Sequence, residues 1–298
     1  MRRVLLIANP ISGSGRNRAR AEALALALGN VSIRAEIAFT ERRGHAVELA
    51  ANAAAEGFES AVAVGGDGTL REVAEGAAAR IPVGVCPSGT ANVVARELMI
   101  PFTIDSIADI IKNGIAAPID TAICNDRRVL FVIGAGFDAE ILNELEKVRR
   151  GGISYRSYIK PIFNVLKRYQ PARLRVSVDG AAARDCTFVI ISNTRYYAGP
   201  WVRFARGPAL NDGVFETYLF HCESVGSLAL AAMRGLAGKL PGGSVECVAG
   251  RKIEIESLES TPIQIDGDAA GAAPASVVVE PRSLPILVSR NSPLAAAK

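Results

Sequence analysis

The first 117 residues alternate short aliphatic runs with alanine-rich stretches of helical length, and this alternation limits the fold more than any other feature. The strand candidates are Val4–Ala8, Ser32–Phe39, Ser60–Val64 and Ile81–Cys86. The helix candidates are Arg16–Leu28, His45–Glu56, Thr69–Ala79, Thr90–Leu98 and Asp105–Lys112. Alternation of this kind is typical of α/β units. We therefore predict an α/β domain over residues 1–117.

After Pro118 the pattern changes to short strands separated by frequent turns. The strand candidates are Thr121–Cys124, Arg128–Ile133, Leu174–Val178, Thr187–Ser192, Val214–Phe220, Val245–Gly250, Lys252–Glu256 and Ile263–Ile265. Helical insertions are expected at Ala139–Arg149, Ser157–Arg168 and Ser224–Lys239, and Ser283–Ser289 is one more strand. This spacing predicts a mainly antiparallel β domain over residues 118–282.

Composition excludes several classes of protein. The 298 residues are 49% hydrophobic and 21% charged, as in an ordered globular chain, and the scattered net charge of +4 argues against a nucleic-acid partner. Five cysteines without a C-x-x-C pair, and only two histidines, indicate no structural zinc and a reducing, cytoplasmic location. No apolar run reaches the roughly 20 residues of a transmembrane segment, so membrane contact is expected to be peripheral.

Glycine-bearing loops follow the first, third and fourth strand candidates. They are Asn9–Gly15, Gly65–Thr69 and Pro87–Asn92. Glycine lets backbone N–H groups approach an anion at a helix N-terminus, and ligands of open α/β sheets bind at the carboxyl ends of strands. The first loop fits a phosphate loop and an ordinary turn equally well. Three such loops on successive units indicate a site for a phosphorylated ligand.

Several polar residues in these loops suit a nucleotide site. Asp67 would engage Mg²⁺ or an acceptor hydroxyl. Thr69 would cap the helix that follows or donate to a phosphate, and Thr90 or Asn92 would do the same at the next strand end. The Walker A, H-E-x-x-H and G-x-S-x-G sequences are absent, which removes support for P-loop, zincin and hydrolase interpretations.

Together these residues resemble the diacylglycerol kinase catalytic family, which includes bacterial lipid kinases and the sphingosine and ceramide kinases. In that family an N-P-x-S-G-x-G start, a G-G-D-G-T loop and a P-x-G-T-x-N loop occur in this order at similar spacing. Later segments, Gly134–Ala139, Asn211–Gly213 and Asp266–Asp268, extend the resemblance over essentially the whole chain. It implies an α/β nucleotide domain like those of phosphofructokinases and NAD kinases, a C-terminal β-sandwich, and a cleft between them for ATP and acceptor. It also implies that residues 283–298 return to the first domain.

Carried over residue by residue, the resemblance implies a set of contacts to ATP. They are Asn9, Ser12, Gly13, Thr40, Gly65, Gly66, Asp67, Gly68, Thr69, Gly89, Thr90 and Asn92. Asp67 would organise Mg²⁺ or polarise the substrate hydroxyl. Asp138 matches a position that contacts a lipid hydroxyl in sphingosine kinases, although it would equally serve as a helix cap.

The resemblance also implies a structural Mg²⁺ and a general base. The metal would be held by the Asp212 carboxylate with the backbone carbonyls of Ala209 and Val214, because oxygen ligands suit this hard cation. Where the family has D-G-E, with a glutamate as base, this chain has Asp266-Gly-Asp268, one methylene shorter. We expect Asp268 to serve, since phosphoryl transfer depends mainly on positioning and charge neutralisation.

The sequence therefore predicts a cytoplasmic, ATP- and Mg²⁺-dependent lipid kinase with peripheral contact at the inner membrane face, and it leaves a homodimer open. Two rivals remain. One is a soluble-substrate kinase of the NAD kinase type, which shares the Gly65–Thr69 pattern. The other is a nucleotide-binding module without catalysis, suggested by Asp268. Gly134–Ala139 also satisfies a dinucleotide fingerprint, but no acidic residue closes a strand about 20 residues on.

Overall fold

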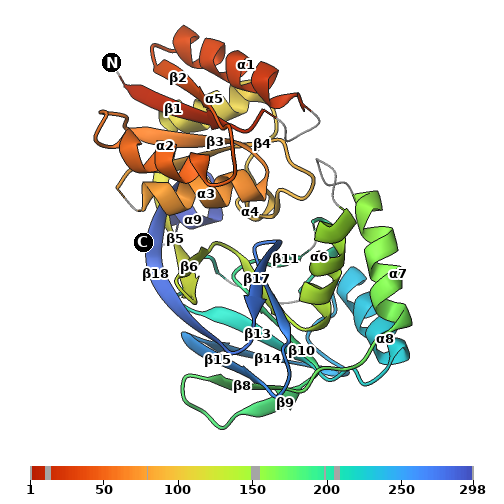
Figure 1. The fold of residues 1–298 in the computed structure, drawn as a ribbon. Helices are drawn as coiled ribbons and strands as arrows, with labels where there is room; N and C mark the ends of the chain where they lie inside the picture. Colours follow the sequence, from red (N-terminus) through yellow and green to blue (C-terminus); the bar gives the residue numbers. More distant parts are fainter. Residues whose placement is uncertain are drawn as a thin grey trace. The chain divides into compact units, whose positions relative to one another are not determined.

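A computed structural model describes residues 2–10, 15–78, 80–148, 155–197, 199–204 and 209–296 (Figure 1). The chain divides into two compact units. Unit 1 comprises Met1–Ile119 with Arg282–Lys298, and unit 2 comprises Asp120–Pro281. Among the described residues, no helix is long and apolar enough to cross a bilayer.

Unit 1 is built on a parallel sheet with the strand order β2-β1-β3-β4, which the C-terminal part of β18 continues. The strands are β1 (Arg3–Ala8), β2 (Arg34–Phe39), β3 (Ser60–Gly65), β4 (Val83–Pro87) and β18 (Ala275–Val288). The helices are α1 (Asn17–Asn30), α2 (His45–Ala53), α3 (Asp67–Ala77), α4 (Val93–Glu97), α5 (Ile104–Asn113) and α9 (Pro293–Ala296). β3 is buried along its whole length, as expected for a central parallel strand.

The helices α1, α2, α3 and α5 each bury one stripe and pack on strands of this sheet. In α1, Ala21, Leu24 and Leu28 recur at helical spacing and are fully buried. α1 packs with α5, and α2 packs with α3. The strand order reverses direction between β1 and β3, which is the kind of point where open α/β sheets bind ligands.

Unit 2 is a β-sandwich. One sheet contains β5 (Ile115–Cys124), β6 (Arg127–Val129), β8 (Leu174–Val178), β9 (Arg184–Cys186), β15 (Lys252–Ser257) and the first part of β18. The other has the order β14-β13-β10-β7-β16-β17. Its strands are β7 (Val132–Ala135), β10 (Phe188–Ser192), β13 (Phe215–Phe220), β14 (Val245–Gly250), β16 (Pro262–Ile265) and β17 (Asp268–Ala272). Alternate side chains of both sheets, such as Val176, Ile253, Val189 and Ile263, form one core.

The remaining elements of unit 2 are helical, apart from one short hairpin. They are α6 (Phe137–Val148), the 3₁₀ turn η2 (Tyr155–Tyr158), α7 (Ile159–Lys167) and α8 (Val225–Leu236), with the hairpin of β11 (Tyr196–Tyr197) and β12 (Val202–Arg203). α6 packs on β16, β7 and β10, and α7 packs on α6. The expected α/β and β-sandwich classes are thus both confirmed.

Three strand predictions differ from the structure by more than one or two end residues. Thr121–Cys124 is only the last part of β5, which begins at Ile115. Arg128–Ile133 was expected to be continuous, but it divides into β6 and β7 because the amides of Leu130, Phe131 and Val132 turn toward the Asp266 carboxylate. Ser283–Ser289 is the end of the much longer β18, whose first half pairs antiparallel with β15. β17 was not expected, because its sequence, Asp-Ala-Ala-Gly-Ala, has low strand propensity.

Candidate functional site

The carboxyl ends of four parallel strands of unit 1 lie in register along one edge of the sheet. Ala8 pairs with Phe39 on one side and with Val64 on the other, and Gly65 pairs with Pro87. The residues that follow these strands therefore share this edge. They are Asn9, Thr40, the Gly65–Thr69 loop and the Pro87–Asn92 loop.

The two later loops touch each other backbone to backbone. A Cβ atom on Gly89 would lie 2.5 Å from Gly66 Cα, and one on Gly66 would lie 3.1 Å from Gly89 Cα. A Cβ on Gly65 would collide with the Thr69 side chain, so these three glycines serve the packing of the loops. Gly68 is different, because it is exposed in the first turn of α3 and a Cβ there would meet nothing within 4 Å. Of these four glycines, Gly68 is the one whose surroundings leave room for a ligand.

Asp67 links the same two loops. It is the first residue of α3, and its Oδ1 accepts a hydrogen bond from Val94 N at 3.4 Å, at the start of α4. Burial raises the pKa of the Asp67 carboxyl, while the amides of Val93, Val94 and Asn92 oppose this rise. The carboxylate predicted to guide Mg²⁺ or a hydroxyl therefore also fixes one loop against the other.

The side chains of Asn92 and Thr69, which were expected to cap helices, make other contacts. Asn92 has a φ of 47° and closes its own loop: its Oδ1 accepts from Gly89 N at 2.9 Å and its Nδ2 donates to Gly89 O at 2.8 Å. It makes no side-chain cap on α4, and Thr69 lies inside α3, whose cap position is Gly66. The capping alternative is thus wrong for both residues, because turn closure and packing use their side chains. Thr90 is exposed.

Asn9 and Thr40 follow the first two strands, β1 and β2. The Asn9 carbonyl accepts from Asn17 Nδ2 at 2.9 Å, which ties the end of β1 to the start of α1. Thr40 is buried, and its N–H donates to Ala8 O at 2.9 Å. Ser12 and Gly13 lie outside the described residues, so their contact with ATP stays a prediction.

Unit 2 holds a separate polar cluster around Asp138, which lies in the first turn of α6. Tyr197 Oη donates to Asp138 Oδ1, and Gln264 Nε2 donates to Asp138 Oδ2 at 2.9 Å. Gly134 permits this approach, because a Cβ there would collide with Asp138 Oδ2. Burial raises the pKa of both the Asp138 carboxyl and the Tyr197 phenol, and the Asp138 charge raises the Tyr197 pKa further.

Asp266 and Asp268 have different surroundings. Asp266 and Gly267 form the two-residue turn between β16 and β17 with φ values of 51° and 86°. The Asp266 carboxylate is 6% exposed and accepts from Leu130 N, Phe131 N and Val132 N at 2.8 to 3.0 Å. Asp268 is the first residue of β17 and is partly exposed. Gln264 Oε1 accepts from Gly267 N at 2.9 Å, so one side chain connects this turn to Asp138.

The turn proposed to hold a metal is built around Asp212. Val214 N donates to Asp212 Oδ1 at 3.2 Å, and Asp212 N donates to the Ala209 carbonyl at 3.2 Å. The buried Asp120 carboxylate fixes the turn by accepting from Gly213 N at 2.6 Å.

Glu216 adds a second carboxylate near this turn. Its Oε2 is buried without a hydrogen-bond partner, and burial followed by the Asp212 charge raises its pKa to about 7. Among the described residues no group of three or more acidic, histidine or cysteine side chains gathers around a possible metal position. A cation here would depend on backbone carbonyls as well, and the unpartnered oxygen fits one.

Sequence reasoning missed the partners of its own candidates. Tyr197 and Gln264 lie far along the chain from Asp138, and Asp120 lies far from the Asp212 turn that it fixes. Glu216 follows the Asp212 turn closely in sequence but was not singled out. No local pattern marks these residues. The only signal is a polar residue at a buried strand position, as at Gln264, which is 1% exposed.

An α/β unit with glycine loops at its sheet edge, followed by a β-sandwich, defines the class of the protein as a two-unit fold. Residues 3–124 match the family described as the diacylglycerol kinase catalytic domain. Residues 131–288 match the YegS C-terminal NAD kinase beta sandwich-like domain. The chain belongs to the diacylglycerol kinase catalytic-domain family.

Related proteins match this chain along nearly its whole length. A diacylglycerol kinase of Bacillus subtilis (strain 168) is 25% identical over 283 residues, 93% of each chain. A diacylglycerol kinase of Staphylococcus aureus (strain bovine RF122 / ET3-1) is 27% identical over 282 residues, which cover 92% of this chain and 89% of that one. A crystal structure described as a diacylglycerol kinase from Bacillus anthracis str. Sterne superposes with a TM-score of 0.73 at 21% identity, over 96% of this chain and 97% of that one. This structural likeness shows the shared fold.

Proposed function

We propose that this kinase-family protein transfers the terminal phosphoryl group of ATP to a hydroxyl of diacylglycerol or a related amphiphilic lipid. Unit 1 is assigned to the nucleotide and unit 2 to the acceptor. The observation that carries the proposal is the pair of loops at the sheet edge of unit 1. Gly66 and Gly89 lock them together, and the open position at Gly68 lies in the first turn of an 11-residue helix.

The N-terminus of α3 suits a polyphosphate. The first N–H groups of a helix lack intrahelical partners and carry the positive end of its dipole, so they attract anions. Gly68 lets a phosphate come close, while Asn92 and Asp67 hold the neighbouring loop in place before any ligand arrives. Phosphoryl transfer depends mainly on positioning and charge stabilisation, which a preformed cradle supplies.

In unit 2, we assign the Asp138 cluster to binding the acceptor hydroxyl. Asp268 is assigned to accepting the proton of that hydroxyl. The hydroxyl oxygen forms a bond to the γ-phosphorus, the bond from that phosphorus to the β,γ-bridging oxygen breaks, and ADP leaves. The hydroxyl proton passes to the Asp268 carboxylate. The turn locked by Asp266 fixes where Asp268 emerges, and Gln264 couples this turn to Asp138.

We propose two magnesium sites. One Mg²⁺ would accompany ATP, where it neutralises phosphate charge, with Asp67 nearby. The other would be structural, held by the Asp212 carboxylate and the carbonyls of Ala209 and Val214, with Glu216 as a further oxygen donor. The buried, unpartnered Glu216 Oε2 supports this second site.

The test is incubation with labelled ATP, Mg²⁺ and mixed micelles of candidate lipids, comparing wild type with Asp67→Ala and Asp67→Asn. Asparagine keeps an oxygen for Val94 N and removes the charge, so it separates chemistry from loop structure. We expect a phosphorylated lipid from wild type and a loss of at least about a hundredfold in both variants. Equal activity of Asp67→Asn and wild type would contradict the role of this charge.

Two further outcomes address the rival functions. Phosphorylation of NAD, with no labelled lipid, would favour a soluble-substrate kinase. ATP binding measured by calorimetry, without turnover on any lipid, would favour a module that has lost catalysis. Asp268→Asn separates the last case, because in an active enzyme it lowers kcat while ATP binding is unchanged.

A further inference from the structure

α7 exposes its apolar face. Ile159, Ile162, Phe163 and Leu166 recur at the i, i+3, i+4, i+7 spacing that normally faces a core. In unit 2 the opposite side, with Pro161 and Val165, is the buried one. Ile159 is 67% exposed and Phe163 is 57% exposed. The helix therefore presents to solvent the stripe that a globular protein usually buries.

α8 repeats this arrangement. Leu228, Ala231 and Gly235 are buried, yet the outward residues are apolar too: Leu230, Met233 and Leu236 are each more than half exposed. Arg234 is the only charged residue of the helix. A helix that is apolar all round is normally enclosed by protein or lipid.

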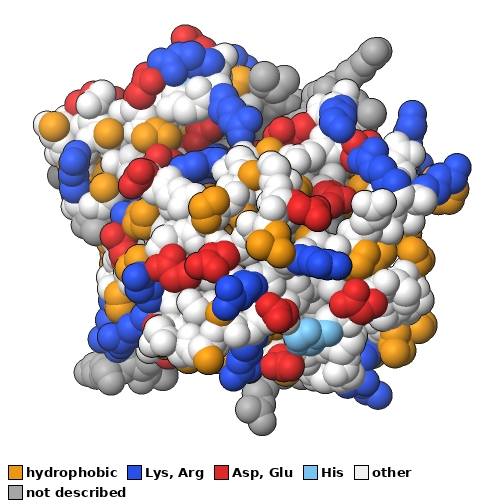
Figure 2. All heavy atoms as spheres, turned by 60° about the horizontal axis from the view of Figure 1, so that its bottom comes forward, with side chains coloured by type: hydrophobic (Ala, Val, Ile, Leu, Met, Phe, Trp, Pro, Cys, Tyr) orange, Lys and Arg blue, Asp and Glu red, His pale blue; other side chains and the backbone are white. Residues whose placement is uncertain are grey.

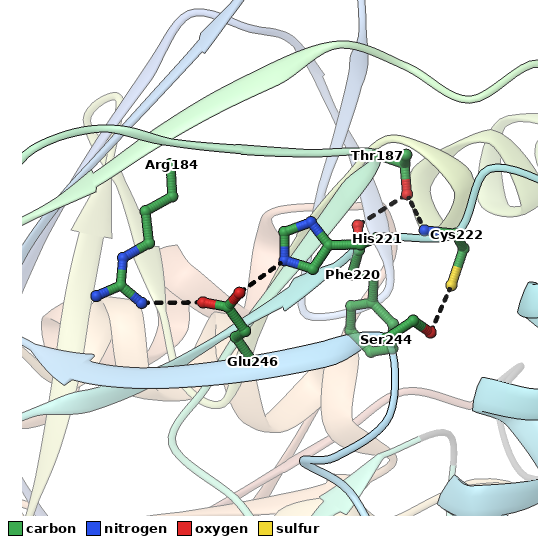
Figure 3. A network of polar contacts seen from close by, with 7 residues as sticks. All are labelled: Arg184, Thr187, Phe220, His221, Cys222, Ser244 and Glu246. Atoms are coloured by element: carbon green, nitrogen blue, oxygen red, sulfur yellow. Dashed lines mark hydrogen bonds and ion pairs between the residues drawn. The ribbon is translucent and has the colours of Figure 1, made fainter.

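Contacts between flanking segments link the two helices at both ends. Tyr169, just after α7, donates from its Oη to the Cys222 carbonyl, just before α8. Thr187 holds the same segment, because its Oγ1 donates to Phe220 O at 2.8 Å and accepts from Cys222 N at 2.9 Å (Figure 3).

At the other end the β11–β12 hairpin makes the connection. Gly199 lies against the Tyr155 hydroxyl of η2, and Val202 lies against Gly235 of α8. Trp201, between them, is 62% exposed. We call the exposed apolar side chains of this region the α7–α8 face. They are Ile159, Ile162, Phe163, Trp201, Leu230, Met233 and Leu236.

The segments that form the α7–α8 face carry charges of one sign, although Glu144 and Glu223 lie beside them. Residues 155–170, 199–204 and 225–240 contain seven lysines and arginines and no aspartate or glutamate, although the whole chain has a net charge of only +4. Glu144 of α6 pairs with one of them, Arg168, at 2.7 Å. On the face drawn in Figure 2, hydrophobic and basic side chains gather along the right-hand edge, the side where Figure 1 shows α7 and α8.

We propose that the α7–α8 face docks on an anionic lipid bilayer, with both helices lying in the plane of the interface. Aromatic and aliphatic side chains bordered by lysine and arginine are what such a surface retains, by apolar burial together with attraction to acidic headgroups. A second copy of the chain fits less well, because a twofold contact would bring two basic borders together. The inference does not depend on which lipid is phosphorylated.

The test is flotation of the full chain with vesicles, without ATP or diacylglycerol. One set is phosphatidylcholine alone, and the other contains phosphatidylglycerol as well. We expect binding to the second set that weakens with salt. The double variant Lys160→Gln/Lys167→Gln should bind more than tenfold more weakly, since each basic residue near the surface contributes about fivefold. Phe163→Ser/Met233→Ser should lose at least about tenfold by removing inserted side chains.

Matched controls keep the result specific. Leu26→Ser and Leu258→Ser remove side chains that are 70% and 80% exposed elsewhere, and Lys252→Gln removes a lysine outside the face. All three should bind like wild type, and circular dichroism melts should show every variant folded. Equal loss in the controls, or no binding of the wild type to acidic vesicles, would overturn the proposal. So would a dimer in analytical ultracentrifugation that the Phe163/Met233 variant dissociates while vesicle binding stays the same.

Lipid kinase activity gives an independent readout. Phe163→Ser/Met233→Ser should retain activity on a short-chain diacylglycerol dissolved as monomers and lose it on acidic vesicles. If no variant and no wild type phosphorylates any lipid, the proposed function fails, while flotation still decides whether the α7–α8 face binds a membrane.

Discussion

Replacing Asp266 removes the acceptor of three backbone N–H groups that bend the chain between β6 and β7. Leu130 N donates to Oδ2 at 2.8 Å, and Phe131 N and Val132 N each donate to Oδ1 at 3.0 Å. The side chain is 6% exposed, so water does not readily take its place. Alanine at this position therefore leaves buried donors without partners.

The expected loss follows from these contacts. Each buried donor left unpaired costs about 1–3 kcal/mol. Residue 266 has a φ of 51°, and a residue other than glycine, asparagine or aspartate adds about 1–2 kcal/mol there. Asp266→Ala should thus destabilise unit 2 by at least about 4 kcal/mol, a large part of the total stability of a typical domain. Asp266→Asn keeps one oxygen and tolerates the backbone conformation, so about 2 kcal/mol is expected.

Hydrogen exchange at the amides of residues 130–132, with urea unfolding followed by circular dichroism, measures this loss. In Asp266→Ala these amides should exchange far faster than in wild type, with Asp266→Asn between the two. Asp268→Asn is the matched control, because Asp268 is partly exposed and its change should affect lipid phosphorylation rather than exchange. Equal protection of the three amides in wild type and Asp266→Ala would refute the reasoning.

Two further predictions concern packing and pH. Gly89→Ala should lower both the melting temperature and the ATP affinity, because its Cβ would lie 2.5 Å from Gly66 Cα. Gly68→Ala should leave the melting temperature unchanged or higher and should weaken only ATP binding, as calorimetry would show. Glu144 is bonded to Lys147 and Arg168, which lower its pKa to about 2, so its contribution is present above about pH 4.5 and is lost as pH falls toward 2. Glu144→Gln should cost about 1 kcal/mol at pH 7, with the difference in urea midpoint shrinking below pH 4.5.

The sequence indicated the fold class well because its signals are local. Strand ends, glycine loops and helical spacing in unit 1 appear within a few residues of one another. The structure places Asn9, the Gly65–Thr69 loop and the Pro87–Asn92 loop on one sheet edge. The packing role of Gly66 and Gly89 was harder to predict from the sequence. Gly66 and Gly89 are separated by a helix and a strand in sequence, so their backbone contact depends on the pairing of β3 with β4.

In unit 2 the acidic residues of the candidate site could be predicted from the sequence, but the residues that contact them could not. Asp138 and Gln264 are 126 residues apart and meet through the pairing of β7 with β16. In Asp266–Asp268 the sequence shows two similar acids, and only the three amides around Asp266 separate a structural carboxylate from a partly exposed one. The exposure of the apolar faces of α7 and α8 also could not be predicted from the sequence, because an apolar stripe by itself predicts burial.

Because residues 282–298 belong to unit 1, this unit is discontinuous in the chain while unit 2 is continuous. During synthesis the outer edge of β4 stays without the partner that Ile286 supplies until almost the entire polypeptide has been made, and open strand edges favour aggregation. A fragment ending at Ile119 would keep that edge bare, whereas a circular permutant that joins the C-terminal strand to the N-terminus through a flexible linker would give an intact, independently expressible half.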